Sequence, residues 1–178
     1  MRCYKRAEFD PAAHSDPART TVQWTQDPVR NSERKLTGVS GAFLYDPESV
    51  LFDPKHPEAI RVYTVKDAGH WVFEGTDLAN GNVFGLYVRS DGQIRTALGA
   101  ETDVRADETP EGFRTLAEMY DSVAGEVRAQ MVIREGDSDR GTVFSAATMD
   151  WVLGLESDQL YPAMSQMTEN VLRRLGGL

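Results

Sequence analysis

The middle of the chain contains histidine and carboxylate side chains at spacings that could support acid–base or metal chemistry. His70 and Glu74 lie four residues apart, and Glu101 and Asp103 lie two residues apart. Histidine is a frequent general base and metal ligand, while paired carboxylates can bind a hard cation or divide acid and base roles between them. We therefore take His70, Glu101 and Asp103 as the candidate catalytic residues, with Glu74 as a neighbour of the histidine.

The backbone around His70 decides whether it can act together with Glu74. The intervening Trp71-Val72-Phe73 is apolar and predicts a short strand, in which residues four apart point to the same side. Their tips are then about two pleats apart, which is too far for one ordinary metal ion unless the strand bends. One histidine also supplies neither a pair of ligands nor a triad. A structural or surface role for His70 is therefore the alternative interpretation.

The segment Glu101-Thr102-Asp103 places two carboxylates on the same side of an extended backbone. The alternative is that both are solvated residues leading into the acidic run 103–108. Nucleophilic catalysis has no support, because Ser145 is not in a Gly-x-Ser-x-Gly elbow and Cys3 has no recognisable partner. No function is assigned to the other two histidines, which are His14 and His56.

Composition limits the partners of the chain. It has 178 residues, a length typical of one domain, and a net charge of −9. This charge argues against binding to nucleic acid or to anionic membrane surfaces, because both interactions depend on lysine and arginine. We find neither an apolar run near the roughly 20 residues that cross a bilayer nor a signal peptide, and a cytoplasmic location is expected. The single cysteine cannot form an internal disulfide.

The first two thirds of the chain favour short strands. Residues 6–35 are polar and contain several Asp-Pro pairs, which predicts a long surface connector. Short strands are expected within 61–65 and at 71–73, and Asn80-Gly81-Asn82 is a strong signal for a tight turn. Residues 83–88 and 94–100 flank a second turn, which predicts a hairpin.

From Thr109 onward the hydrophobic pattern has a helical period. Thr109 can cap a helix, Pro110 suits its first position, and apolar residues at 113, 116, 117 and 120 share one face. Residues 127–133 and 142–147 then predict two strands. A closing helix is expected to bury one stripe and to end at Gly176-Gly177. The members of that stripe are Met164, Met167, Val171, Leu172 and Leu175. This order predicts an α/β fold with a mixed sheet and flanking helices.

Six segments follow one another along the chain and carry a family resemblance. They are Met1-Arg2-Cys3-Tyr4-Lys5, Asp16-Pro17-Ala18-Arg19, Arg34-Lys35-Leu36-Thr37-Gly38-Val39, His70-Trp71-Val72-Phe73-Glu74-Gly75-Thr76, Gly99-Ala100-Glu101-Thr102-Asp103, and the tail from Gly141 to Leu175. Read together, they resemble the C-terminal region of the large (beta) subunit of the N,N-dimethylformamidase family. One departure is Ala100, which stands where the family has a tyrosine before its Glu-x-Asp element.

The resemblance implies hydrolysis of N-substituted formamides to a carboxylate and an amine. It also implies a scaffold similar to class I glutamine amidotransferase-like, or trehalose-utilisation-like, domains. Family enzymes hold a mononuclear iron with tyrosines and a glutamate, and those ligands are expected upstream of Met1. A metal-activated water would then attack the formamide, and His70, Glu101 and Asp103 are the residues here that could assist.

Residues 1–178 are thus expected to form a single C-terminal domain of a longer amidohydrolase. The interior-strand pattern of residues 1–5 supports a fragment, whose partners would be the missing N-terminal portion and a small subunit. One alternative is a stand-alone binding or assembly module that keeps the scaffold without the chemistry. Another is a complete small hydrolase that uses His70, Glu101 and Asp103 on a small amide substrate.

Overall fold

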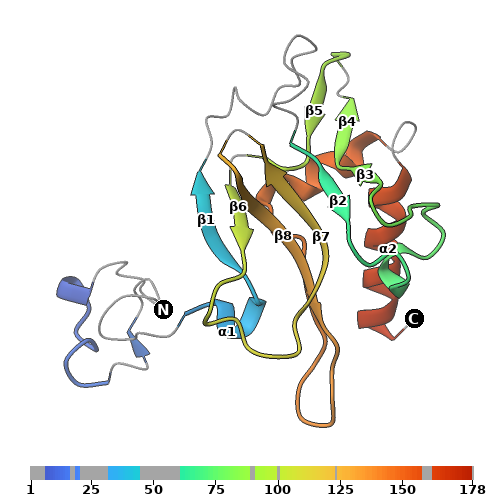
Figure 1. Cartoon of the computed structure of the whole chain (residues 1–178). Helices are drawn as coiled ribbons and strands as arrows, with labels where there is room; N and C mark the ends of the chain where they lie inside the picture. Colours follow the sequence, from blue (N-terminus) through green and yellow to red (C-terminus); the bar gives the residue numbers. More distant parts are fainter. Residues whose placement is uncertain are drawn as a thin grey trace.

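The structure is a computed structural model, and it describes residues 7–16, 19–20, 32–44, 61–88, 91–99, 101–122, 124–157 and 162–177. Its largest sheet has five strands in the order β3-β2-β7-β8-β9, formed by Val83–Phe84, Tyr63–Val65, Arg114–Asp121, Glu126–Arg134 and Val143–Ser145 (Figure 1). Two smaller sheets pair β1 (Ser40–Leu44) with β6 (Glu101–Val104), and β4 (Leu86–Val88) with β5 (Ile94–Thr96).

Helices accompany these sheets in the described part of the chain. The α-helices are α1 (Arg34–Thr37) and α2 (Pro162–Gly176), and the 3₁₀ helices include η1 (Ala7–Phe9), η5 (Trp71–Phe73) and η6 (Met149–Ser157). Sheets and helices together agree with the predicted α/β class. Every strand pair among the described residues is antiparallel, however, so no mixed sheet is seen in that part.

Several predicted elements are confirmed. The strand at 127–133 is β8, and the strand at 142–147 contains β9. The hairpin predicted from residues 83–88 and 94–100 is present as the β4–β5 pair, but residues 83–84 form β3 of the five-stranded sheet instead of extending it. Asn80 and Gly81 form the expected turn, where Gly81 has a φ of 86° that glycine adopts without strain. Residues 1–5, for which an interior strand is predicted, lie outside the described residues. So does His56, to which no function is assigned.

The helix predicted from Thr109 is wrong, because residues 114–121 form strand β7. This strand pairs with β2 on one side and with β8 on the other. Its register against β8 shifts between Thr115 and Ala117 and again between Met119 and Tyr120. Such bulges place neighbouring residues on the same face, so Leu116 and Ala117 are both fully buried. The resulting apolar spacing imitates a helical period in the sequence.

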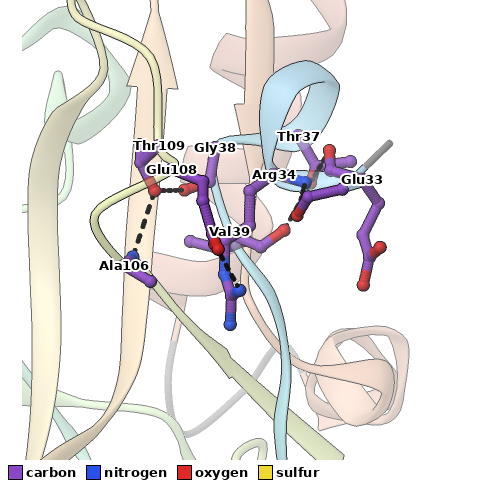
Figure 2. Close-up of polar contacts among 9 residues, drawn as sticks. Glu33, Arg34, Thr37, Gly38, Val39, Ala106, Glu108 and Thr109 are labelled. Atoms are coloured by element: carbon purple, nitrogen blue, oxygen red, sulfur yellow. Dashed lines mark hydrogen bonds and ion pairs between the residues drawn. The ribbon is translucent and has the colours of Figure 1, made fainter. Parts of the chain in front are cut away.

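Thr109 fixes a turn instead of capping a helix. Its hydroxyl donates to the Gly38 carbonyl at 2.8 Å and accepts from the Ala106 amide at 3.1 Å (Figure 2). Arg34 of α1 pairs with Glu108 at 3.0 Å in the same place. These contacts join α1 to the loop between β6 and β7, and they hold the N-terminal end of β1 beside β6.

The five-stranded sheet is buried on both faces. On one face Met131 and Ile133 of β8 pack with Met164 and Met167 of α2, while Val132 points the other way into a second cluster. That second cluster contains Val39, Phe113, Val132 and Ala147. Figure 1 shows α2 on one side of the β7–β8 pair and β1 with β6 on the other.

The predicted stripe of α2 is correct for its first three members. Met164, Met167 and Val171 are buried in the core. Leu172 is 64% exposed because it is rotated by about 100° from Val171 around the helix axis. Leu175 lies in the last turn and is 47% exposed, so the stripe is shorter than predicted. Gly177, with a φ of 68°, ends the helix as expected.

Candidate functional site

Glu101 and Asp103 lie together on β6, as their spacing predicts. Asp103 is the register partner of Gly41 on β1, and Glu101 is the partner of Leu44. A β-carbon at Gly41 would lie 3.0 Å from Glu101 Oε1 and 3.6 Å from Asp103 Oδ1. Both carboxylates therefore extend over the backbone of Gly41, whose missing side chain leaves room for them. We call Glu101 and Asp103 the carboxylate pair.

The residue between the two carboxylates anchors the strand. Thr102 is fully buried, and its hydroxyl donates to the Arg128 carbonyl of β8 at 2.6 Å. The Asp103 amide donates to the Ala147 carbonyl at 3.0 Å, and Thr102 also forms a bridge with Thr148. Because successive side chains of a strand point to opposite sides, fixing Thr102 inward directs the carboxylate pair outward over β1.

The pKa of Asp103 is raised from its usual value. Burial is the largest cause, and the negative charges of Glu101 and Glu33 add to it, while Arg34 opposes the shift. Glu33 and Arg34 lie in the turn and helix that precede β1 (Figure 2). The helix α1 and its N-cap therefore take part in the electrostatics of Asp103. A carboxyl group with a raised pKa keeps its proton to higher pH than usual, which is a requirement for a general acid.

His70 has a different position from the one predicted. Trp71–Phe73 is the 3₁₀ helix η5 rather than a strand, and His70 is its N-cap. Its Nδ1 accepts a hydrogen bond from the Val72 amide at 3.3 Å, and its Nε2 lies 3.1 Å from Glu135 Oε1. Glu74 is exposed at the opposite end of η5, so it does not pair with His70.

The pKa of His70 is lowered, mainly because burial disfavours the charged ring. Its hydrogen bond to Glu135 and the charges of Glu135 and Asp67 oppose that effect, and the charge of Arg114 adds to it. Glu135 is the partner that sequence reasoning missed. It follows β8 and lies 65 residues from His70 in the sequence, so no local pattern connects the two.

His70 and the carboxylate pair lie at different ends of β8. Thr102, which lies between the two carboxylates, donates a hydrogen bond to the Arg128 carbonyl near the start of β8. His70 contacts Glu135 just after the end of that strand. Glu135 is seven positions after Arg128, which is roughly 23 Å along an extended strand. The structure thus brings Glu101 and Asp103 together but keeps His70 away from them.

The histidine, aspartate and glutamate side chains of the described residues, and the buried Tyr63, do not fit a bound iron. Among them, no group of three or more His, Cys, Asp or Glu side chains is placed to hold a metal ion. Tyr63, a buried tyrosine near Asp103, donates its hydroxyl hydrogen to the Ala146 carbonyl, and burial raises its pKa well above 10.0. Because a metal-bound tyrosine is a phenolate, this environment disfavours Tyr63 as a ligand.

Two further observations concern the remaining candidates and the helices. Ser145 accepts a hydrogen bond from the Ala147 amide at 3.3 Å, and His14 is exposed, while Cys3 lies outside the described residues. No helix in the described ranges combines the length and the apolar character needed to span a bilayer.

Comparison with known protein families identifies a match over most of the chain. A family model described as N,N-dimethylformamidase beta subunit-like, C-terminal, matches residues 1–167 of the chain. The match includes β1, the carboxylate pair and all strands of the five-stranded sheet. No curated protein matches the chain.

Proposed function

Because the chain belongs to the N,N-dimethylformamidase beta subunit-like C-terminal family, we propose that it is the C-terminal domain of an amidohydrolase that cleaves N-substituted formamides. The observation that carries this proposal is the match over 1–167, which covers most of the 178 residues. The whole of residues 1–178 is proposed as a single domain, and its scaffold relationship to class I glutamine amidotransferase-like domains belongs to the same proposal.

The reaction adds water across the amide bond and gives formate and an amine. Without a proton the amide nitrogen would have to leave as a strongly basic anion, so a proton must reach that nitrogen as the carbon–nitrogen bond breaks. Asp103 is suited to supply it, because burial and Glu101 favour its protonated form. Glu101 then provides a second carboxylate beside the protonated nitrogen, whose positive charge is lost when the carbon–nitrogen bond breaks and the neutral amine departs. We propose that the carboxylate pair forms this part of the active-site wall.

The remaining catalytic groups are proposed to lie outside the described residues. Among those residues, no group of three or more His, Cys, Asp or Glu side chains is placed to hold the iron that the family resemblance implies. We therefore assign water activation to the preceding part of the protein, and only proton transfer near the leaving amine to this chain. His70 is proposed to support the fold, since both of its ring nitrogens already have hydrogen-bond partners.

The family description also motivates a proposal about partners. The words "beta subunit-like" and "C-terminal" imply an N-terminal portion of the same polypeptide or another subunit. We propose that the missing N-terminal portion is the main partner, that a small subunit can join the assembly, and that the substrate is a small amide in the cytoplasm. The alternative is a non-catalytic binding or assembly module, and the experiment must distinguish it from the amidohydrolase domain.

The test compares two proteins in an amine-release assay. The first is the present chain, and the second is the chain extended by its upstream coding segment and loaded with iron. With N,N-dimethylformamide as substrate, the extended protein is expected to release dimethylamine and formate, while the present chain releases little or none. A well-folded extended protein that binds no iron and cleaves no formamide would overturn the enzymatic proposal and favour the binding module.

A further inference from the structure

Three side chains join η5 to the end of β8. His70 Nε2 lies 3.1 Å from Glu135 Oε1, and the indole nitrogen of Trp71 donates to the same oxygen at 2.6 Å. The His70 side chain is only 4% exposed, whereas that of Glu135 is 52% exposed. We call His70, Trp71 and Glu135 the His70 clasp. It lies roughly 23 Å along β8 from the anchor of the carboxylate pair, and it does not depend on the proposed function.

The hydrogen bonds of the clasp define the protonation state of its histidine. Nδ1 accepts from the Val72 amide at 3.3 Å, so this nitrogen carries no hydrogen. The hydrogen of the neutral ring is then on Nε2, where it is donated to the Glu135 carboxylate. A proton added to Nδ1 would face the Val72 N–H, and two donors would meet. The present arrangement therefore requires the neutral ring.

The clasp also supports α2, the helix that covers the core. The side-chain amide of Asn170 donates to the carbonyls of Val72 and Glu74 at 3.0 and 2.8 Å. Its nitrogen also lies 3.4 Å from the Trp71 carbonyl oxygen. The guanidinium of Arg174 lies over the Trp71 ring, 5.7 Å from its centre. Because α2 contacts the η5 backbone in this way, a change in η5 is transmitted to α2.

We propose that the His70 clasp is a proton-operated latch that holds η5 and the C-terminal half of α2 in place. When His70 is neutral, its Nδ1 satisfies the buried Val72 amide and η5 offers its carbonyls to Asn170. When Nδ1 takes up a proton, the Val72 amide loses its acceptor and the ring must turn away. The latch opens locally, while β7 and β8 keep their pairing.

Charged groups from every neighbouring element bear on this proton. Glu135 after β8 and Asp67 before η5 attract it, while Arg114 of β7, paired with Asp67 at 3.3 Å, repels it. Arg174 of α2 adds a positive charge above Trp71. Glu135 is half exposed, so water screens its attraction, and burial of the ring prevails.

The sign of the pH effect follows from the lowered pKa of His70. As the pH falls, His70 of the unfolded chain takes up a proton near pH 6.5, whereas His70 of the folded chain takes it up at a lower pH. The stabilising contribution of the neutral ring is therefore complete above about pH 6.5, and it is lost as the pH falls through the lower pKa of the folded state. The latch is closed above about pH 6.5 and opens as the pH falls through the lower pKa of the folded state.

The test uses the full chain labelled with ¹⁵N. Imidazole nitrogen shifts are expected to show the Nε2–H tautomer of His70 at about pH 8. Amide exchange at Val72, corrected for the intrinsic pH dependence of exchange, should become about tenfold faster between about pH 7.5 and pH 5, because a buried hydrogen bond is lost. Amides in the centre of β8 should not change by more than about twofold. An Nδ1–H tautomer, or equal acceleration at both places, would overturn the latch.

Two variants separate the latch from general acid sensitivity. In His70→Asn the side-chain oxygen can still accept from the Val72 amide at the N-cap but does not titrate, so exchange at Val72 should lose its pH dependence. In Glu135→Gln an oxygen acceptor remains but the charge is removed, so the opening midpoint should shift to lower pH. A wild-type pH response in His70→Asn, or an unshifted midpoint in Glu135→Gln, contradicts the proposal.

Discussion

The carboxylate of Asp150 lies directly against the α-carbon of Gly99. A β-carbon added to Gly99 would be 1.5 Å from Asp150 Oδ2 and 2.5 Å from Asp150 Cβ. The second contact involves the base of the side chain, so rotation of the carboxylate cannot relieve it. This contact holds the start of η6 against the segment that leads into β6 and the carboxylate pair.

Gly99→Ala is therefore expected to destabilise the fold by roughly 2–3 kcal/mol, because the backbone must move to admit the methyl group. Chemical denaturation measures the change. Gly141→Ala is the matched control, since a β-carbon there meets nothing within 4 Å. A stability of Gly99→Ala equal to that of the control would show that Asp150 and Gly99 are not in close contact.

Asn170→Asp tests the attachment of α2 to η5. The change replaces an amide that donates to the Val72 and Glu74 carbonyls with a carboxylate that repels them. We expect a loss of about 2–3 kcal/mol at neutral pH, more than for Asn170→Ala, which only removes the donors. The difference between the two variants should narrow at low pH, where the new carboxylate takes up a proton. Equal stabilities at all pH values would contradict the assignment of Asn170 as a donor.

The two sides of α2 should respond differently to shortening. Met167 is fully buried, and Met167→Ala is expected to cost about 2–5 kcal/mol because it leaves a cavity in the core. Leu172→Ala should change the free energy of unfolding by no more than about 0.5 kcal/mol, since that side chain is 64% exposed. Thermal and denaturant unfolding of both variants provide the measurement, and similar losses would mean that Leu172 is covered in solution.

Asp103→Asn is expected to stabilise the fold at neutral pH. The pKa of Asp103 is raised in the folded state, so its contribution to stability is present below about 3.8, the unfolded value, and is lost as the pH rises through the folded pKa. The stability gain of Asp103→Asn should thus grow as the pH rises above about 3.8 and should level off once the pH has passed the folded-state pKa.

A control is needed because the chain has a net charge of −9, so removal of any carboxylate reduces repulsion. Glu111→Gln removes one from an exposed turn and should give a smaller and flatter gain. Indistinguishable pH profiles for the two variants would show that Asp103 has no special environment.

Local sequence patterns predict an element correctly where the spacing of its apolar residues matches the face that is buried in the structure. In strand β8, Ala129, Met131 and Ile133 face one side and are buried in the core, as alternation predicts. Val132 faces the other side and is buried in the second cluster. Helix α2 has a clear stripe and a glycine stop. Strand β7 was mistaken for a helix because its two bulges replace strict alternation with an apparent helical period.

The candidate site was only partly accessible from the sequence. The common side of Glu101 and Asp103 follows from the geometry of a strand, and the structure confirms it. The role of Gly41 beneath them depends on the pairing of β1 with β6, which joins segments about sixty residues apart. The apolar Trp71-Val72-Phe73 predicts a strand with His70 and Glu74 on the same side, about two pleats apart. In the structure this segment is a 3₁₀ helix, and the partner of His70 is Glu135, which follows the distant end of β8.

The most direct measurement is the turnover number of the extended, iron-loaded protein on N,N-dimethylformamide, compared between wild type and Asp103→Asn. We predict that wild type releases dimethylamine and that Asp103→Asn, although folded, is slower by a factor of about 100 or more, because the departing nitrogen loses its proton donor. Glu111→Gln should retain full turnover. Undiminished turnover in Asp103→Asn would contradict the role of the carboxylate pair, and no turnover in a folded, iron-loaded wild type would contradict the enzymatic assignment itself.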